Sequence, residues 1–214
     1  YLDEIRPDLV VWQYCSNDFV NNSYQLELNS EYNNNGLIRP YLEGDRIVYR
    51  MPKPYPGLVS FLSVKSYLVR FVLEKVYRIE ASRETDSIER EMGKYGLDLP
   101  EFNEAFQVTG RLMQQVKQRA GDVPVVTFEC DTTSPKSSAA LREVSSRSNL
   151  AFVHEVDEVL TQARKGGAPI FVADGAHWNE AGHELVGETL SSYLAREYAD
   201  LFVDAGGVTT YDLV

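Results

Sequence analysis

The chain has 214 residues, 43% of them hydrophobic and 25% charged, which is ordinary for a globular protein and enough for one sizeable core. Its 21 basic and 32 acidic side chains give a net charge of −11. This acidity argues against a non-specific nucleic-acid binder and against an electrostatic anchor on anionic lipid, because both need a basic surface. The acidity therefore predicts no nucleic-acid partner. No apolar run reaches the roughly 18 residues of a membrane span, so we expect no membrane span.

Short apolar runs predict the strands of a mainly parallel sheet. Residues 8–14 form a nearly continuous apolar run, which predicts a strand buried on both faces. Residues 123–130 have the same pattern, and residues 150–154 predict a shorter third strand that includes His154 as a core residue. A brief extended segment is expected at 170–172 and a short strand at 46–51.

Segments with helical periodicity alternate with these strands. Helices are predicted over 58–78, over 101–119, from Ser134-Pro135 to about residue 146, and over 179–197. Ser134 suits an N-cap that is followed by proline at the first helical position. The alternation of strand and helix predicts an α/β fold.

We expect one domain over residues 1–214 with an insertion around 19–122, because a plain strand-to-strand crossover needs far fewer residues. The insertion contains the polar stretch at 29–36 and the turn-rich stretch at 52–57. It is expected to form part of a substrate wall or a lid.

The two cysteines, Cys15 and Cys130, have no metal-ligand spacing. Both follow apolar runs, so two buried free thiols are expected rather than a disulfide. Cysteine usage therefore leaves the compartment open, and the sequence indicates no metal and no organic cofactor.

The segment Asp174-Gly175-Ala176-His177 can perform proton chemistry. In a tight turn, Asp174 can hydrogen-bond one ring nitrogen of His177 and leave the other as a general base. Asn179 is then a natural N-cap for the following helix. The alternative is a structural Asp–His turn that closes a loop onto that helix, and the spacing alone does not decide between the two.

The segment Asn17-Asp18 follows the first predicted strand. The Asn17 amide could donate to a developing oxyanion, while Asp18 holds the loop through backbone N–H groups. The alternative is an ordinary Asx turn that ends the strand and caps a helix. Ligands of open parallel sheets bind beyond the carboxyl ends of the strands, where both this segment and the Asp174–His177 segment are expected.

Together these segments carry a family resemblance. "PDLVVWQYCSNDF" at 7–19, followed far downstream by "VADGAHWNEAGHELVGETL" at 172–190, resembles the SGNH (GDSL-type) hydrolases. The resemblance implies a flavodoxin-like three-layer α/β/α sandwich that hydrolyses lipid, aryl or O-acetyl sugar esters without a metal or cofactor. By this resemblance Asn17 is an oxyanion donor, His177 the general base and Asp174 its orienting carboxylate, whereas His183 is structural.

The sequence departs from the family pattern at three places. Cys15 stands where the family usually has glycine, and no Gly-Asp-Ser block, which carries the family's nucleophilic serine, occurs in the sequence. The family's second block, with its glycine donor, is also not identifiable. Neither Cys15 nor Ser16 is a convincing substitute nucleophile. We therefore expect a chain that lacks the N-terminal strand and nucleophile block, belongs to a longer protein and folds poorly without the missing N-terminal segment.

The expected function is a serine esterase or deacylase acting on a small-molecule, carbohydrate or lipid ester. Polymer or lipid substrates would favour an extracellular or periplasmic location. The alternative is a non-catalytic module of the same fold that binds a glycan or acyl group, which the missing nucleophile favours and the retained His177 and Asn17 disfavour. A nucleotide-binding or receiver domain is weaker still, since the phosphate loop and acidic cluster are missing.

Overall fold

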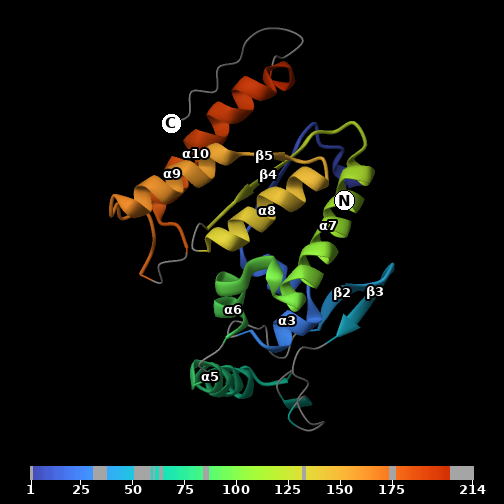
Figure 1. The fold of residues 1–214 in the computed structure, drawn as a ribbon, viewed down its shortest axis with the longest axis vertical. Coiled ribbons are helices and arrows are strands. Elements are labelled where there is room, and N and C mark those ends of the chain that lie inside the picture. Colours follow the sequence, from blue (N-terminus) through green and yellow to red (C-terminus); the bar gives the residue numbers. More distant parts are fainter. Residues whose placement is uncertain are drawn as a thin grey trace. The chain divides into compact units, whose positions relative to one another are not determined.

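The computed structural model describes residues 2–30, 38–50, 59, 61–62, 65–83, 87–131, 134–173 and 177–202 (Figure 1). It is a mixed α/β structure with a three-stranded parallel sheet and a two-stranded antiparallel sheet, which confirms the predicted α/β class. The chain divides into two compact units. Unit 1 comprises Tyr1–Tyr14, Lys117–Thr133 and Leu150–Val214, and unit 2 comprises Cys15–Val116 and Ser134–Asn149.

The parallel sheet belongs to unit 1. Its strands β1 (Val10–Tyr14), β4 (Val125–Glu129) and β5 (Ala151–Phe152) lie in the order β1-β4-β5. All three follow predicted strands, and both pairings are parallel as expected. Every residue of the central strand β4 is buried, including the polar Thr127 and Glu129, as expected for the interior strand of a parallel sheet.

The prediction that the first strand is buried on both faces was wrong. Val11 is 43% exposed and Gln13 is exposed, while Tyr14 is buried. Among the described strands β1 lies at the edge of the sheet, with β4 as its one partner. A continuous apolar run shows that a strand suits a sheet interior, but it does not show whether neighbours cover both faces.

Two helices complete the described core of unit 1, α9 (His154–Lys165) and α10 (Glu180–Glu197). Short helical turns α1 (Leu2–Ile5) and η2 (Ala199–Leu201) accompany them. The buried core combines one strand with both helices: Val126, Phe128, Val153, Val156, Leu160, Ile170 and Val186. Helix α10 confirms the helix predicted over 179–197.

His154 is not a core strand residue. It is the first residue of α9, its side chain is exposed, and its ring lies 4.9 Å from that of Phe152. Two acidic residues, Glu155 and Asp157, occupy the first turn of α9, where the helix dipole favours negative charge. These acidic residues were the sequence signal that the strand ends before His154.

Unit 2 is mainly helical. Its helices are α2 (Asn17–Asn21), α3 (Tyr24–Leu28), α5 (Tyr67–Arg83), α6 (Ile88–Tyr95), the 3₁₀ turn η1 (Gly96–Asp98), most of α7 (Pro100–Ala120) and α8 (Pro135–Arg147). Helices α7 and α8 confirm the helices predicted there, and the Oγ of Ser134 caps α8 by accepting from the Ser137 N–H. Within the range 58–78, the described residues are helical except Ser66. No described helix of either unit combines the length and apolar character that crossing a membrane requires.

A β-hairpin in unit 2 contacts the buried carboxylate of Glu27. Strands β2 (Arg39–Glu43) and β3 (Arg46–Arg50) pair antiparallel; β3 matches the strand expected at 46–51, and β2 was not predicted. The fully buried Glu27 of α3 accepts hydrogen bonds from the Tyr41 hydroxyl at 2.6 Å and the Arg39 guanidinium at 3.0 Å. These contacts attach the hairpin to α3. Burial, and then the neighbouring Glu27 carboxylate, raise the pKa of Tyr41 well above its usual range.

Two glycines of α10 provide a matched test of packing. A Cβ at Gly182 would lie 2.3 Å from the Ile170 carbonyl oxygen and 2.9 Å from the Trp178 Cβ, whereas a Cβ at Gly187 meets nothing within 4 Å. We expect Gly182→Ala to lower the free energy of unfolding by about 1–3 kcal/mol, because backbone must move. Gly187→Ala should raise it by about 0.5–1 kcal/mol through helix propensity. Urea unfolding measures both, and equal effects would contradict the packing described.

The alkaline stability of the protein tests the Tyr41–Glu27 contact. Because the folded-state pKa of Tyr41 is raised, its contribution is fully present below the unfolded pKa of about 10 and is lost as the pH rises above that value. We expect Tyr41→Phe to lower the free energy of unfolding by about 1.5–3 kcal/mol at neutral pH and to flatten its alkaline decline. Urea titrations between pH 7 and 11 measure this, with the exposed Tyr49→Phe as control. An unchanged alkaline slope in Tyr41→Phe would contradict the assignment.

Candidate active site

The turn after β1 is closed by two reciprocal hydrogen bonds. The Cys15 N–H donates to Oδ2 of Asp18 at 2.8 Å, and the Asp18 N–H donates to the Cys15 carbonyl at 2.9 Å. This pair converts the strand directly into helix α2, whose N-cap is Ser16. Asp18 thus holds the loop through a backbone N–H. Both the oxyanion interpretation and the ordinary turn require this contact, so it does not choose between them.

Asn17 is the first residue of α2 and its side chain is exposed. The helix is fixed in unit 2 by Phe19, which is fully buried and packs edge-on against Phe102 with ring centroids 5.1 Å apart. At the other end of α2, the Asn22 amide donates to the Thr109 hydroxyl of α7 at 3.2 Å. A rigidly held short helix therefore carries an exposed amide three residues beyond the carboxyl end of β1.

The two cysteines are disulfide-bonded, so the expectation of two free thiols was wrong. Neither Cys15 nor Cys130 is free. Each directly follows a strand, and the residues before them, Tyr14 and Glu129, are register partners of β1 and β4. Parallel pairing places such residues side by side, within the short distance that a disulfide needs. The sequence hides this relation because it does not show the register.

The structure places His177 in a loop whose ends are joined in unit 1. Phe171 and Trp178 form an antiparallel bridge, and the Val172 N–H donates to the His177 carbonyl at 2.9 Å. The bridge agrees with the extended segment expected at 170–172. The His177 side chain is exposed. Asp174, predicted as its orienting carboxylate, lies outside the described residues, as do Gly175 and Ala176.

Trp178 attaches this loop to the sheet. Its indole stacks on Phe128 with ring centroids 6.5 Å apart and an angle of 20° between the planes. Phe128 is the penultimate residue of β4, so the residue that follows His177 packs near the carboxyl end of the central strand. This anchoring role of Trp178 was not predicted, because nothing in a single sequence pairs it with Phe128.

The start of α10 fixes the other side of the loop. The Asn179 Oδ1 accepts from the Gly182 N–H at 3.0 Å, which confirms Asn179 as the N-cap, and the Asn179 N–H donates to the Ile170 carbonyl at 3.0 Å. The ring of His183 packs edge-on against Trp178 with centroids 5.4 Å apart. A shallow hollow lined by Asn179, Glu180, Ala181 and Glu184 lies at this helix start.

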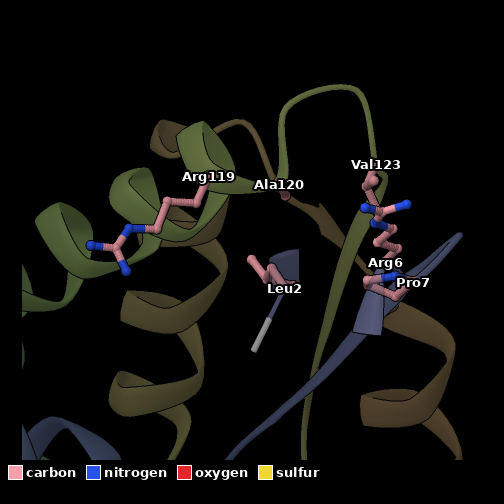
Figure 2. A pocket seen from close by; sticks show the side chains of 6 residues that line it. All are labelled: Leu2, Arg6, Pro7, Arg119, Ala120 and Val123. Atoms are coloured by element: carbon pink, nitrogen blue, oxygen red, sulfur yellow. The ribbon is translucent and has the colours of Figure 1, made fainter. Parts of the chain in front are cut away.

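A second cavity of about 400 Å³ in unit 1 lies at the opposite ends of the strands. It is lined by Leu2, Arg6, Pro7, Arg119, Ala120 and Val123 (Figure 2). Pro7 and Val123 precede β1 and β4, so the cavity is at the amino ends rather than the carboxyl ends. Figure 2 shows Arg6 and Arg119 on opposite sides, with guanidinium groups that do not converge on one point. The cavity therefore does not form a two-arginine anion site.

In the described part of the chain, one group of three residues has its potential metal-ligand atoms close together. Potential ligand atoms of Cys15, Cys130 and Asp131 lie within 4.8 Å of one another. Because both sulfurs are in the disulfide, neither is available as the thiolate that a metal requires. The group does not form a metal centre in this oxidised state.

Comparisons with known proteins identify no relative: no family model, no curated protein and no solved structure matches the chain. The roles of the candidate site residues are therefore inferred from the sequence and structure of this chain alone. Asn17 belongs to unit 2 and His177 to unit 1.

The contribution of Asp18 to the turn can be measured. Asp18→Ala leaves the Cys15 N–H without this acceptor, and we expect the free energy of unfolding to fall by about 1–2 kcal/mol. Asp18→Asn retains an acceptor oxygen and should lose less than half as much. Urea unfolding with the disulfide intact measures both variants. Equal losses would mean that the hydrogen bond does not hold the turn.

Proposed function

We propose that the chain provides the general base and an oxyanion donor of an SGNH-type serine ester hydrolase with a flavodoxin-like α/β/α sandwich. The observation that carries the proposal is the stacking of Trp178 on Phe128, which anchors the loop of His177 near the carboxyl end of β4. Asn17 follows the carboxyl end of the neighbouring strand β1. Open parallel sheets bind their ligands beyond the carboxyl ends of their strands.

The proposed chemistry assigns a role to each residue. A serine hydroxyl attacks the ester carbonyl carbon while the ring of His177 accepts its proton, and Asp174 orients that ring. The Asn17 amide donates to the oxyanion that forms on the carbonyl oxygen. His177 then returns the proton to the leaving alkoxide, and water hydrolyses the acyl-enzyme by the same steps. Because the sequence contains no Gly-Asp-Ser block, the proposal places the nucleophilic serine outside these 214 residues.

The disulfide favours an oxidising compartment for the proposed enzyme. Structural disulfides persist in oxidising compartments and are rare in the cytosol. The bond between Cys15 and Cys130 therefore favours an extracellular or periplasmic protein. Such a location suits ester substrates on polymers or lipids.

The proposal is tested on the protein as its gene encodes it, using p-nitrophenyl ester hydrolysis and fluorophosphonate labelling. We expect labelling of a serine and its loss in His177→Ala. Asn17→Ala should lower kcat by about 10²–10³-fold, the effect of removing one oxyanion donor. His183→Ala is the matched control, because the resemblance gives this neighbouring histidine a structural role, so its loss should leave kcat within a few-fold.

Two results would overturn the proposal. Equal activity of His177→Ala and His183→Ala would remove His177 from the reaction. A folded, gene-length protein that neither labels nor hydrolyses esters would favour the glycan- or acyl-binding module instead, since that function needs no nucleophile.

A further inference from the structure

Helix α5 exposes an apolar face that most helices of a globular protein bury. The exposed side chains are Tyr67, Leu68, Phe71, Val72 and Val76, with Leu68 at 71% and Phe71 at 55%. At 100° per residue they form two adjacent rows at four-residue spacing and cover about half of the helix circumference. No other described helix or strand packs extensively against α5.

Cationic side chains accompany this apolar face. The Lys75 ammonium lies 5.3 Å from the centroid of the Phe71 ring, and the Arg70 guanidinium lies 5.5 Å from that of Tyr67. Lys65, just before the helix, is also exposed. Long basic side chains extend their charged ends toward lipid headgroups while their stems cover apolar surface. The helix thus presents apolar groups together with cations.

We propose that α5 is an interfacial helix that docks the protein on an anionic lipid surface. The apolar rows would enter the boundary between headgroups and acyl chains, and Lys65, Arg70 and Lys75 would contact lipid phosphates. This inference does not depend on the proposed ester hydrolase.

The charge and width of the face favour lipid over other occupants. A second copy packed face to face on α5 would bury Lys75, whose ammonium lies beside Phe71 within the apolar rows, and the cost of desolvating this charge opposes the contact. A groove in a protein partner usually accepts a narrower stripe of anchors than half the circumference. The chain's net charge of −11 argues against an electrostatic anchor formed by the whole protein. It does not oppose docking through α5 alone, because screening over about 8 Å makes the local charge of that helix dominant at a membrane surface.

Vesicle sedimentation tests the proposal, using phosphatidylcholine vesicles with or without about 30% phosphatidylglycerol as the anionic lipid. We expect binding to the anionic vesicles that weakens as salt is raised. Leu68→Glu and Phe71→Glu should each weaken binding at least about tenfold, because each removes a buried apolar side chain from the interface. Replacing Lys65, Arg70 and Lys75 by glutamine should cost about fivefold per cation.

Ile5→Glu is the matched control. Ile5 is 70% exposed, nearly the same as Leu68, but lies in the short helix α1 of unit 1. Its replacement should leave vesicle binding unchanged, and circular dichroism and urea midpoints should show all variants folded. Absence of binding to either vesicle, or equal losses in Ile5→Glu and Phe71→Glu, would overturn the proposal. A dimer in solution that Leu68→Glu dissociates, with no vesicle binding, would assign the face to a second copy instead.

Discussion

The parallel pairing of β1 with β4 is the constraint on which the candidate site depends. The Val10 N–H donates to the Pro124 carbonyl at one end, and the Cys130 N–H donates to the Tyr14 carbonyl at the other. The carboxyl ends of parallel strands lie at the same end of a sheet. The turn after β1 and the residue after β4 therefore begin at the same end, and the disulfide between Cys15 and Cys130 links them covalently. A change of register would separate these cysteines and reverse the faces of the paired side chains.

The polar residues of the two candidate segments divide into those that hydrogen-bond the backbone and those whose side chains are exposed. Asp18 accepts a backbone hydrogen bond across its turn, and Asn179 does the same at the start of α10. Their sequence positions follow from turn and capping chemistry alone. Asn17 and His177 differ because turn formation leaves both side chains exposed. An oxyanion donor and a general base must both be able to reach a substrate, which is why these two exposed residues support the functional proposal better than their polar neighbours.

Sequence reasoning located the features that depend on local signals and missed those that depend on distant neighbours. The central strand β4, the cap of α8 by Ser134 and the cap of α10 by Asn179 all have short-range signatures. The disulfide, the exposed face of β1 and the stacking of Trp178 on Phe128 arise from pairings between segments far apart in the chain. A single sequence contains no information on register, so these could not be derived. The start of α9 is different: its acidic first turn was visible and was outweighed by a short apolar run.

The two proposals rest on separate parts of the molecule and constrain each other only through the substrate. The ester hydrolase is argued from the ends of β1 and β4, whereas lipid docking is argued from α5 in unit 2. Taken alone, the hydrolase proposal leaves sugar esters and lipid esters equally open. A helix with half its circumference apolar and exposed has no evident use toward a soluble sugar ester, but it would hold an enzyme at the surface where lipid esters lie. If both proposals hold, the acidic body and the basic, apolar helix belong to one enzyme of the lipid interface, and the substrate is an ester within or attached to that surface.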